Sequence, residues 1–465
     1  MERRPGRRHP DRGLEAVGRP ARGRRDGGRV LARGRGRVEL PPGPRAPAAW
    51  QTVAWTVRPA GFLRRVHRSF GDPATIRTFW TDEPMVLFSH PDAVRELFRL
   101  DPAVAPAGQS WEFLRPFAGD HSIALLDGDE HLRERRLIQA PFHGERMRAL
   151  QPLVAELAHE ELNGWSGRVV TLERMKRLTL ETILRVVFGV RGERETAELR
   201  DAVHGTLDTV RSMPRMLAMA LVQRDFGPRS PWGRFRLGVE RFDSLLLDVI
   251  ASRRADPGDD SMLTVLLEQR DEDGNPPSDR RLRDQLVALL VAGHDTSAAS
   301  LSWAFERLAR HPRVQARVRE GDPAYLDAVV KEVLRVRPAL TIAPRKLLEP
   351  VTIAGRRIPA GVHVAACLWL SMRREDLWQD AAAFRPERWL GDGAPPGAAA
   401  WIPFGGGVRR CAGAPFAEME MREVLRAAAE LLEISPVHAE PEPARRSALV
   451  VTPARGGEVL AARRL

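Results

Sequence analysis

The chain has 465 residues, of which 43% are hydrophobic and 29% are charged. This hydrophobic share is ordinary for a globular protein and excludes a chain that is disordered throughout. Its two cysteines exclude a disulfide scaffold and any metal site built from four thiolates. No apolar run is longer than seven residues, whereas a membrane-spanning helix needs about 18–20, so we expect no membrane span.

Positive charge is concentrated at the N-terminal end. Residues 1–40 hold 13 arginines and five acidic residues, a net charge of +8 out of +12 for the whole chain. Their Arg-, Gly- and Pro-rich composition predicts a disordered extension, followed by a single domain over residues 41–465. A nucleic-acid-binding arm is the alternative. No aromatic residue in this extension offers base stacking, so we expect no nucleic-acid partner. It also lacks the apolar stretch of a secretion signal, and we expect a cytoplasmic protein.

Apolar residues at helical spacing dominate the remainder of the chain. Helices are predicted over residues 129–140, 148–162, 175–189, 196–212, 232–254, 281–310, 324–336 and 414–432. Short strands are predicted at Met85–Phe88, Val351–Ile353 and Val362–Leu368, with a weak pair at Leu449–Thr452 and Glu458–Ala461. The predicted fold class is therefore mostly α with small β-sheets (α+β).

The most informative segment is Phe404–Gly413, with the sequence FGGGVRRCAG. Its three consecutive glycines allow the backbone to approach a flat ligand and to adopt dihedral angles that other residues avoid. Cys411 directly precedes a predicted helix that has Pro415 in its first turn. The helix dipole and the free N–H groups of this end would stabilise a thiolate. Arg409, two residues before the cysteine, could pair with an anionic group of a ligand.

These residues match the pattern F-x-x-G-x-R-x-C-x-G at every fixed position: Phe404, Gly407, Arg409, Cys411 and Gly413. The chain therefore resembles the cytochrome P450 superfamily of haem-thiolate monooxygenases, in its soluble bacterial style. The resemblance implies haem b as cofactor, with Cys411 as the axial ligand of the iron and the other four residues contacting the haem. It also implies that the haem lies between this loop and a long central helix over about 279–310. The second cysteine, Cys367, reads as a buried strand residue.

A second motif lies within that long helix, at Ala292–Ser297. Ala292 lies one turn before Thr296, so the threonine hydroxyl can bond its carbonyl, and the small residues Ala292 and Gly293 leave space for a diatomic ligand. The segment is similar to the family's [AG]-G-x-[DE]-T-[TS] motif. By resemblance, Thr296 supports dioxygen at the haem and Asp295 helps to deliver protons. The alternative is a polar face on a surface helix, but the flanking residues are largely apolar.

Two further sets of charged residues follow the family's pattern. Glu332 and Arg335 resemble its E-x-x-R pair, and Arg388, in Pro386–Trp389, would complete a structural network. His131 and Arg135 lie one helical turn apart and resemble the H-x-x-x-R site that holds the haem propionates. A solvated charged face is the alternative for that pair. Arg345 lies where the family places another propionate ligand.

The resemblance implies a haem-dependent monooxygenase that inserts one oxygen atom of dioxygen into a small apolar organic substrate. No nucleotide-binding, flavin or iron–sulfur motif is present in the sequence. Electrons are therefore expected from NAD(P)H through a ferredoxin or flavodoxin and its reductase, with the enzyme acting as a monomer. Substrate contacts are predicted in Ala103–Ser122 and Leu207–Trp232. A peroxide-driven peroxygenase and a non-catalytic haem-thiolate sensor or electron carrier are the alternatives.

Overall fold

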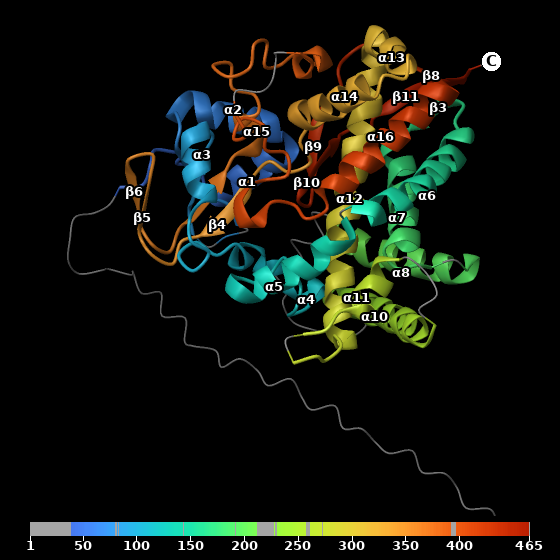
Figure 1. Ribbon diagram of the computed structural model, residues 1–465. Helices are drawn as coiled ribbons and strands as arrows, with labels where there is room; N and C mark the ends of the chain where they lie inside the picture. Colours follow the sequence, from blue (N-terminus) through green and yellow to red (C-terminus); the bar gives the residue numbers. More distant parts are fainter. Residues whose placement is uncertain are drawn as a thin grey trace, which may run out of the picture. The chain divides into compact units, whose positions relative to one another are not determined.

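Helices are the dominant elements of the computed structural model (Figure 1). The structure describes residues 39–464 except residues 80, 82, 143, 191, 212–226, 228–229, 257–260, 272 and 392–396. The extension predicted over residues 1–40 lies outside the described residues up to residue 38. Residues Glu39–Leu465 form one compact unit.

The helices run in chain order from a short N-terminal pair to the long helix that follows Cys411. They are α1 (Ala48–Val57), α2 (Pro59–Phe70), α3 (Pro91–Phe98), α4 (Arg115–Ala118), α5 (Gly128–Gln139), α6 (Gly144–Asn163), α7 (Thr171–Val186), α8 (Glu193–Arg211), α10 (Pro231–Ala255), α11 (Met262–Glu268), α12 (Asp279–Arg310), α13 (Pro312–Arg319), α14 (Pro323–Val336), α15 (Leu368–Ser371) and α16 (Ala414–Leu431). Four 3-10 turns connect them: η1 (Gly108–Leu114), η2 (Ala140–Phe142), η3 (Pro386–Trp389) and η4 (Gly407–Arg409).

The strands are short and form small sheets. They are β1 (Ala74–Ile76), β2 (Met85–Phe88), β3 (Gly167–Val170), β4 (Ala343–Lys346), β5 (Val351–Ile353), β6 (Arg356–Ile358), β7 (His363–Ala366), β8 (Leu432–Pro436), β9 (Ala444–Ser447), β10 (Val450–Pro453) and β11 (Glu458–Arg463). One sheet has the order β1-β2-β7-β4, with β2 and β7 parallel. A second has the order β3-β11-β8, and β5-β6 and β10-β9 are antiparallel pairs.

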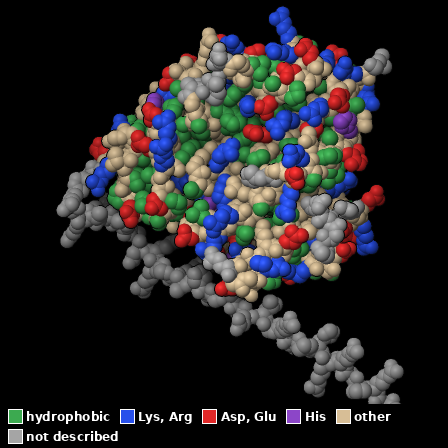
Figure 2. Space-filling model, in the orientation of Figure 1, with side chains coloured by type: hydrophobic (Ala, Val, Ile, Leu, Met, Phe, Trp, Pro, Cys, Tyr) green, Lys and Arg blue, Asp and Glu red, His purple; other side chains and the backbone are tan. Residues whose placement is uncertain are grey.

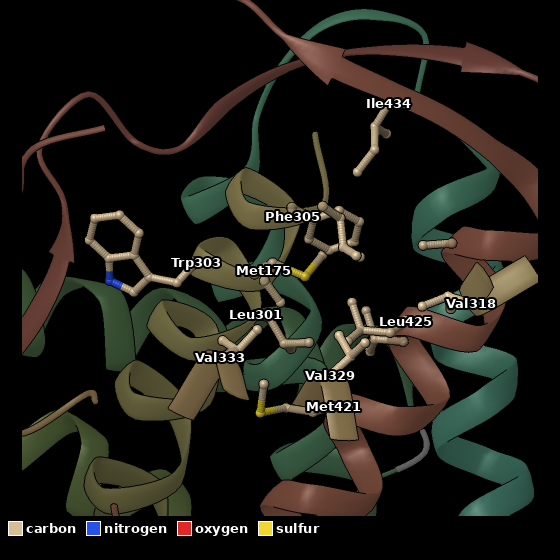
Figure 3. Close-up of a cluster of buried hydrophobic side chains, with 14 of the residues drawn as sticks. Met175, Leu301, Trp303, Phe305, Val318, Val329, Val333, Met421, Leu425 and Ile434 are labelled. Atoms are coloured by element: carbon tan, nitrogen blue, oxygen red, sulfur yellow. The ribbon is translucent and has the colours of Figure 1, made fainter. Parts of the chain in front are cut away.

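The long helix α12 forms the centre of the helical part, because apolar residues line more than one of its faces. It packs against α7, α10, α14 and α16. Figure 3 shows one of the resulting clusters, in which Leu301 and Phe305 of α12 meet Val333 of α14 and Leu425 of α16. All four side chains are buried. The helices that carry the candidate site residues are therefore held in one continuous core.

The fold class and all eight predicted helices are confirmed, with ends that differ by a few residues. The predicted strands also form, but the one predicted over Val362–Leu368 ends at Ala366, and Leu368 begins α15. The last two strands do not pair with each other. Val450–Pro453 pairs with β9, and Glu458–Arg463 pairs with β3 and β8. The sheet was not predicted because its strand β8 begins directly after α16, with no break in the sequence that would separate a strand from the helix. Within the described residues, no helix combines the length and the apolarity needed to cross a membrane.

Candidate functional site

The loop that carries Cys411 is tied to itself just before α16. The N–H of Cys411 donates to the carbonyl oxygen of Phe404 at 2.9 Å, and the N–H of Arg410 donates to that of Gly407 at 3.1 Å. Gly413 is the N-cap residue of α16, and Pro415 lies in the first turn, where proline is tolerated. The cysteine therefore sits where N–H groups at a helix end point outward without intrahelical partners.

The thiol of Cys411 is accessible, although protein atoms crowd around it. This crowding raises the pKa of the thiol above its ordinary value. The N–H groups of Gly413 and Ala414 and the charges of Arg135 and Arg410 lower it, as a helix end and nearby cations should. Because burial outweighs them, the thiol would lose its proton when it binds a metal rather than before.

The glycines of this loop serve packing as well as conformation. Gly405 and Gly407 have φ angles of +69° and +64°, which favour glycine. A Cβ atom at Gly406 would lie 2.4 Å from the ring of Phe98, and one at Gly407 would lie 2.2 Å from the Phe98 carbonyl oxygen. These glycines therefore allow the loop to pack closely against the end of α3. The sequence alone had suggested only that they allow the loop to approach a flat ligand.

Thr296 makes the hydrogen bond that its spacing predicts. Its Oγ1 donates to the carbonyl oxygen of Ala292 at 2.6 Å, within α12. Ala292 is exposed, and Asp295 and Thr296 are partly exposed, so these three residues are reachable from outside the helix core. The next turn is also modified, because Ser300 Oγ donates to the Thr296 carbonyl oxygen at 2.8 Å. This turn of α12 thus carries a hydroxyl and a carboxylate that are both partly exposed.

Another side of this turn faces α7. A Cβ atom at Gly293 would lie 3.2 Å from Cδ1 of Ile183, so this glycine allows α7 and α12 to pack closely. His294 is fully buried, and its Nδ1 lies 3.0 Å from Thr179 Oγ1 of α7. His294 Nε2 lies 4.0 Å from Asp295 Oδ1. The contact with α7 therefore fixes the orientation of the turn that carries Asp295.

Glu420 of α16 is a buried carboxyl group that sequence reasoning missed. It is 2% exposed and hydrogen-bonded to Ser297 and Thr182. Burial raises its pKa to about 7, although both hydrogen bonds act in the opposite direction. The residue looks like one polar position among many on α16, and only the meeting of α7, α12 and α16 makes it distinctive.

Four predicted propionate ligands come together from three elements. His131 and Arg135 lie on α5, Arg345 on β4 and Arg409 on η4. The pKa of His131 is lowered to about 3, first by burial and then by the charges of Arg409, Arg135 and Arg345. Burial and the charge of Arg409 lower the pKa of Arg345 to about 10. His131 and Arg345 are 3% and 7% exposed, so this is a buried cluster rather than a solvated charged face.

One carboxylate opposes these cations. Arg409 pairs with Asp127 Oδ1 and donates to the carbonyl oxygens of Ile123, at 3.1 Å, and of Leu126. Asp127 Oδ1 also accepts the N–H of Ala107 at 2.9 Å. Asp127 was missed because an aspartate just before a helix is read as a cap, yet its side chain makes no capping hydrogen bond.

The balance of charge in this cluster fits a dianionic prosthetic group. Asp127 pairs with Arg409, and its charge also acts on Arg345. The charges that act on Arg135 are those of Cys411 and Arg410. Buried charges are normally paired, and two propionates would supply the missing anions. Together with one accessible sulfur at Cys411, this charge balance suits the donor set of a haem.

The predicted structural network is fully formed. Glu332 and Arg335 of α14 are completely buried, and Arg335 donates through Nε and Nη2 to the two oxygens of Glu332 at 2.8 Å. Glu332 also accepts the N–H of Arg385 at 2.8 Å, Arg388 Nε at 3.0 Å and Trp389 Nε1 at 3.0 Å. Arg335 further donates to three backbone carbonyl oxygens, those of Met372, Ala381 and Ala383. Glu332 and Arg335 thus anchor the irregular chain before the Cys411 loop.

The segments predicted to contact substrate are only partly described. In the first, Phe117 is buried against Phe235 and Phe242 and belongs to the core. Phe113 is 45% exposed. In the second, residues 212–226 lie outside the described residues, and the three methionines of that segment lie among them. Cys367 is buried as predicted, but it follows β7 as the N-cap residue of α15, and burial raises the pKa of its thiol to about 12.

Known proteins are similar to this chain in sequence and in fold. The family model described as Cytochrome P450 matches residues 41–461. A protein of Mycobacterium tuberculosis named as a cytochrome P450 135B1 is 38% identical over 90% of this chain and 91% of its own. Another from the same species, named as a cytochrome P450 138, is 35% identical over 92% and 97%. The structure of retinoic acid bound cyanobacterial CYP120A1 covers 92% of this chain and 100% of its own, with a TM-score of 0.78 and 23% identity.

Proposed function

Because the chain belongs to the cytochrome P450 family, the haem-thiolate monooxygenases, we propose that it inserts one oxygen atom of dioxygen into an apolar organic substrate. The observation that carries this proposal is the accessible Cys411 beside a buried cation cluster that lacks matching carboxylates. A non-catalytic sensor or electron carrier would need the same haem site. It would not need the accessible carboxylate and hydroxyl of Asp295 and Thr296.

Haem b would be held at both its metal and its carboxylates. Cys411 Sγ would bind the iron, and His131, Arg345 and Arg409 would hold the propionates. When bound, such a haem supplies oxygen activation, which a thiolate ligand favours by pushing electron density towards the iron. Arg135 donates to the Arg410 carbonyl oxygen at 2.5 Å and so braces the residue before the cysteine.

Asp295 and Thr296 of α12 would deliver protons to the site. The Thr296 hydroxyl proton is held on the Ala292 carbonyl oxygen, and it can be turned towards a ligand at the site without leaving Oγ1. Asp295 is partly exposed, so it can take up a proton and release it to Thr296 Oγ1 or to a water beside it. The retention of this pair argues against a peroxide-driven enzyme, which needs no such proton delivery.

Electrons would come from NAD(P)H through a separate ferredoxin or flavodoxin and its reductase. Arg133 and Arg136 of α5 and Arg410 beside the cysteine are exposed, and they form the proposed docking rim for an acidic partner. Blue side chains are frequent across the middle of the face shown in Figure 2. Complementary charge of this kind mainly raises the rate of encounter. All residues proposed for the site come from one chain, so a monomer suffices.

The proposal is tested by reconstituting the haem-loaded protein with a ferredoxin, its reductase and NADPH. A lipid and natural-product library is first screened for shifts of the haem absorption band. A compound that shifts the band should then be converted to a product that carries one oxygen atom from labelled dioxygen. A protein that binds haem and shifts with ligands, but forms no labelled product with any of them, would contradict the proposed activity and favour a sensor.

A further inference from the structure

The N-terminal helix α1 buries two polar side chains and exposes three apolar ones. Gln51 and Thr52 are completely buried. Trp50, Val53 and Val57 are 52%, 58% and 57% exposed. Their spacing of three and four residues places them on one face of the helix. A globular protein normally orients a helix in the opposite way, so the exposed face requires a cause.

The orientation of α1 is fixed by hydrogen bonds on its inner side. Gln51 Nε2 donates to the carbonyl oxygen of Ala46 at 2.8 Å, and Gln51 Oε1 accepts the N–H of Arg77 at 3.0 Å. Thr52 Oγ1 accepts the N–H of Phe79 at 3.1 Å. Trp55 adds an apolar anchor, since it is 2% exposed and lies under the guanidinium of Arg446. Turning the apolar face inward would break all of these contacts.

α1 and the elements that pack around it carry arginines and have no acidic residue of their own. α1 packs against α2 and β9, and α2 also packs against β1 and α15. The labels of α1, α2, α15 and β9 lie in the same part of Figure 1. None of the five contains Asp or Glu. Arg58, between α1 and α2, and Arg65 and Arg68 of α2 are exposed. We define the α1 surface as the apolar stripe of α1 together with these three arginines: Trp50, Val53, Val57, Arg58, Arg65 and Arg68.

We propose that the α1 surface docks on an anionic lipid bilayer, with the three apolar side chains in the interface and the arginines on the headgroups. A short helix with one apolar face and flanking arginines is suited to lie in the plane of a membrane. Tryptophan is favoured at this depth because its ring is amphipathic. Such docking is peripheral and would give a monooxygenase access to apolar compounds dissolved in the membrane.

The charge of the α1 surface favours a lipid bilayer over another protein as its partner. A second copy of this chain would bring its own acid-free basic surface against the first, and like charges repel. Anionic headgroups offset every arginine of the α1 surface. Each arginine contributes a factor of about five to the partition coefficient. A half-exposed apolar side chain contributes about the same factor when it is buried.

The test is co-sedimentation of the full-length, haem-loaded protein with vesicles of equal parts phosphatidylglycerol and phosphatidylcholine at physiological salt. Replacing Trp50, Val53 and Val57 by Ser should lower the partition coefficient on the order of 100-fold, by three factors of about five. A matched control replaces Leu237, Leu247 and Leu460, which are 43%, 40% and 44% exposed elsewhere, and should bind like the parent. All of these residues are exposed, so folding and haem content should be unchanged.

The arginines are tested separately. Replacing Arg58, Arg65 and Arg68 by Gln should lower the partition coefficient to a similar extent, whereas removing the same charge at Arg148, Arg194 and Arg313 should not. The arginine-rich extension over residues 1–38 is present in every protein compared, so it contributes equally to each. The proposal is overturned if the apolar triple variant sediments like the parent, or if the parent ignores the vesicles. It is also overturned if sedimentation velocity shows a dimer of the parent that the apolar triple variant loses.

Discussion

Glu332 is the residue whose replacement should cost the fold most. Its two oxygens accept five hydrogen bonds, from Arg335 (two), the N–H of Arg385, Arg388 and Trp389. Glu332→Gln keeps the volume but removes the charge. The new amide group places N–H donors opposite groups that are themselves donors, so hydrogen bonds are lost there. The guanidinium of Arg335 would be left completely buried without a counter-charge. Breaking a buried ion pair by removing one partner costs about 3–5 kcal/mol, and we expect a loss of that size.

The assay is urea unfolding of the haem-loaded protein, followed by circular dichroism and by loss of the haem absorption band. Asp327→Asn is the matched control on the same helix. Asp327 pairs with Arg422 and Lys331, but it is 32% exposed, so its loss should cost less than about 1 kcal/mol. Trp389→Phe removes one of the five hydrogen bonds and should cost about 1.5–3 kcal/mol. It remains measurable if Glu332→Gln does not fold. Losses below about 1 kcal/mol for both Glu332→Gln and Trp389→Phe would refute this reasoning.

Four further predictions concern the site and its neighbours. Thr296→Ala should lower the product formed per NADPH consumed and raise peroxide release, with haem content unchanged. Asp295→Asn should instead slow turnover, about 100-fold or more for a lost general acid. Turnover and coupling that match the parent would count against both roles. Glu420 has a folded-state pKa raised from 4.5 to about 7, so between these values the unfolded chain binds fewer protons and the free energy of unfolding falls as pH rises. Glu420→Gln should remove up to about 3 kcal/mol of that fall, and a pH profile like the parent's would contradict the assignment. Arg345→Gln should weaken haem retention in a chase with apomyoglobin and leave unfolding by urea little changed, since Arg345 is offset by few partners in the chain. Equal haem loss from both proteins would contradict a propionate contact.

Local patterns predicted the helices because apolar spacing and packing agree along each of them. The α12 bounds and the Thr296 hydrogen bond to Ala292 follow from the sequence within one element. The Glu332–Arg335 pair does so too, since an i,i+3 spacing on a helix brings the side chains together. These are cases in which the partners lie a few residues apart.

Contacts between distant elements could not be predicted in the same way. Asp127 reaches Arg409 across 282 residues, and nothing in the local sequence distinguishes it from a helix cap. Gly406 packs on Phe98, and Gly293 packs on Ile183, so the purpose of these glycines depends on which helix lies opposite. Glu420 becomes a buried acid only where three helices meet. The inverted helix α1 was missed because its buried polar residues are satisfied by partners on other segments.

The most direct test of the central claim is the carbon-monoxide difference spectrum of the reduced, haem-loaded protein. The parent and Cys367→Ser should show the red-shifted Soret band of a thiolate ligand, because Cys367 is fully buried away from the loop. Cys411→Ser should bind haem through the cation cluster and lose that band. A red-shifted band that persists in Cys411→Ser, or that disappears in a folded Cys367→Ser protein, would contradict the assignment of Cys411 as the axial ligand.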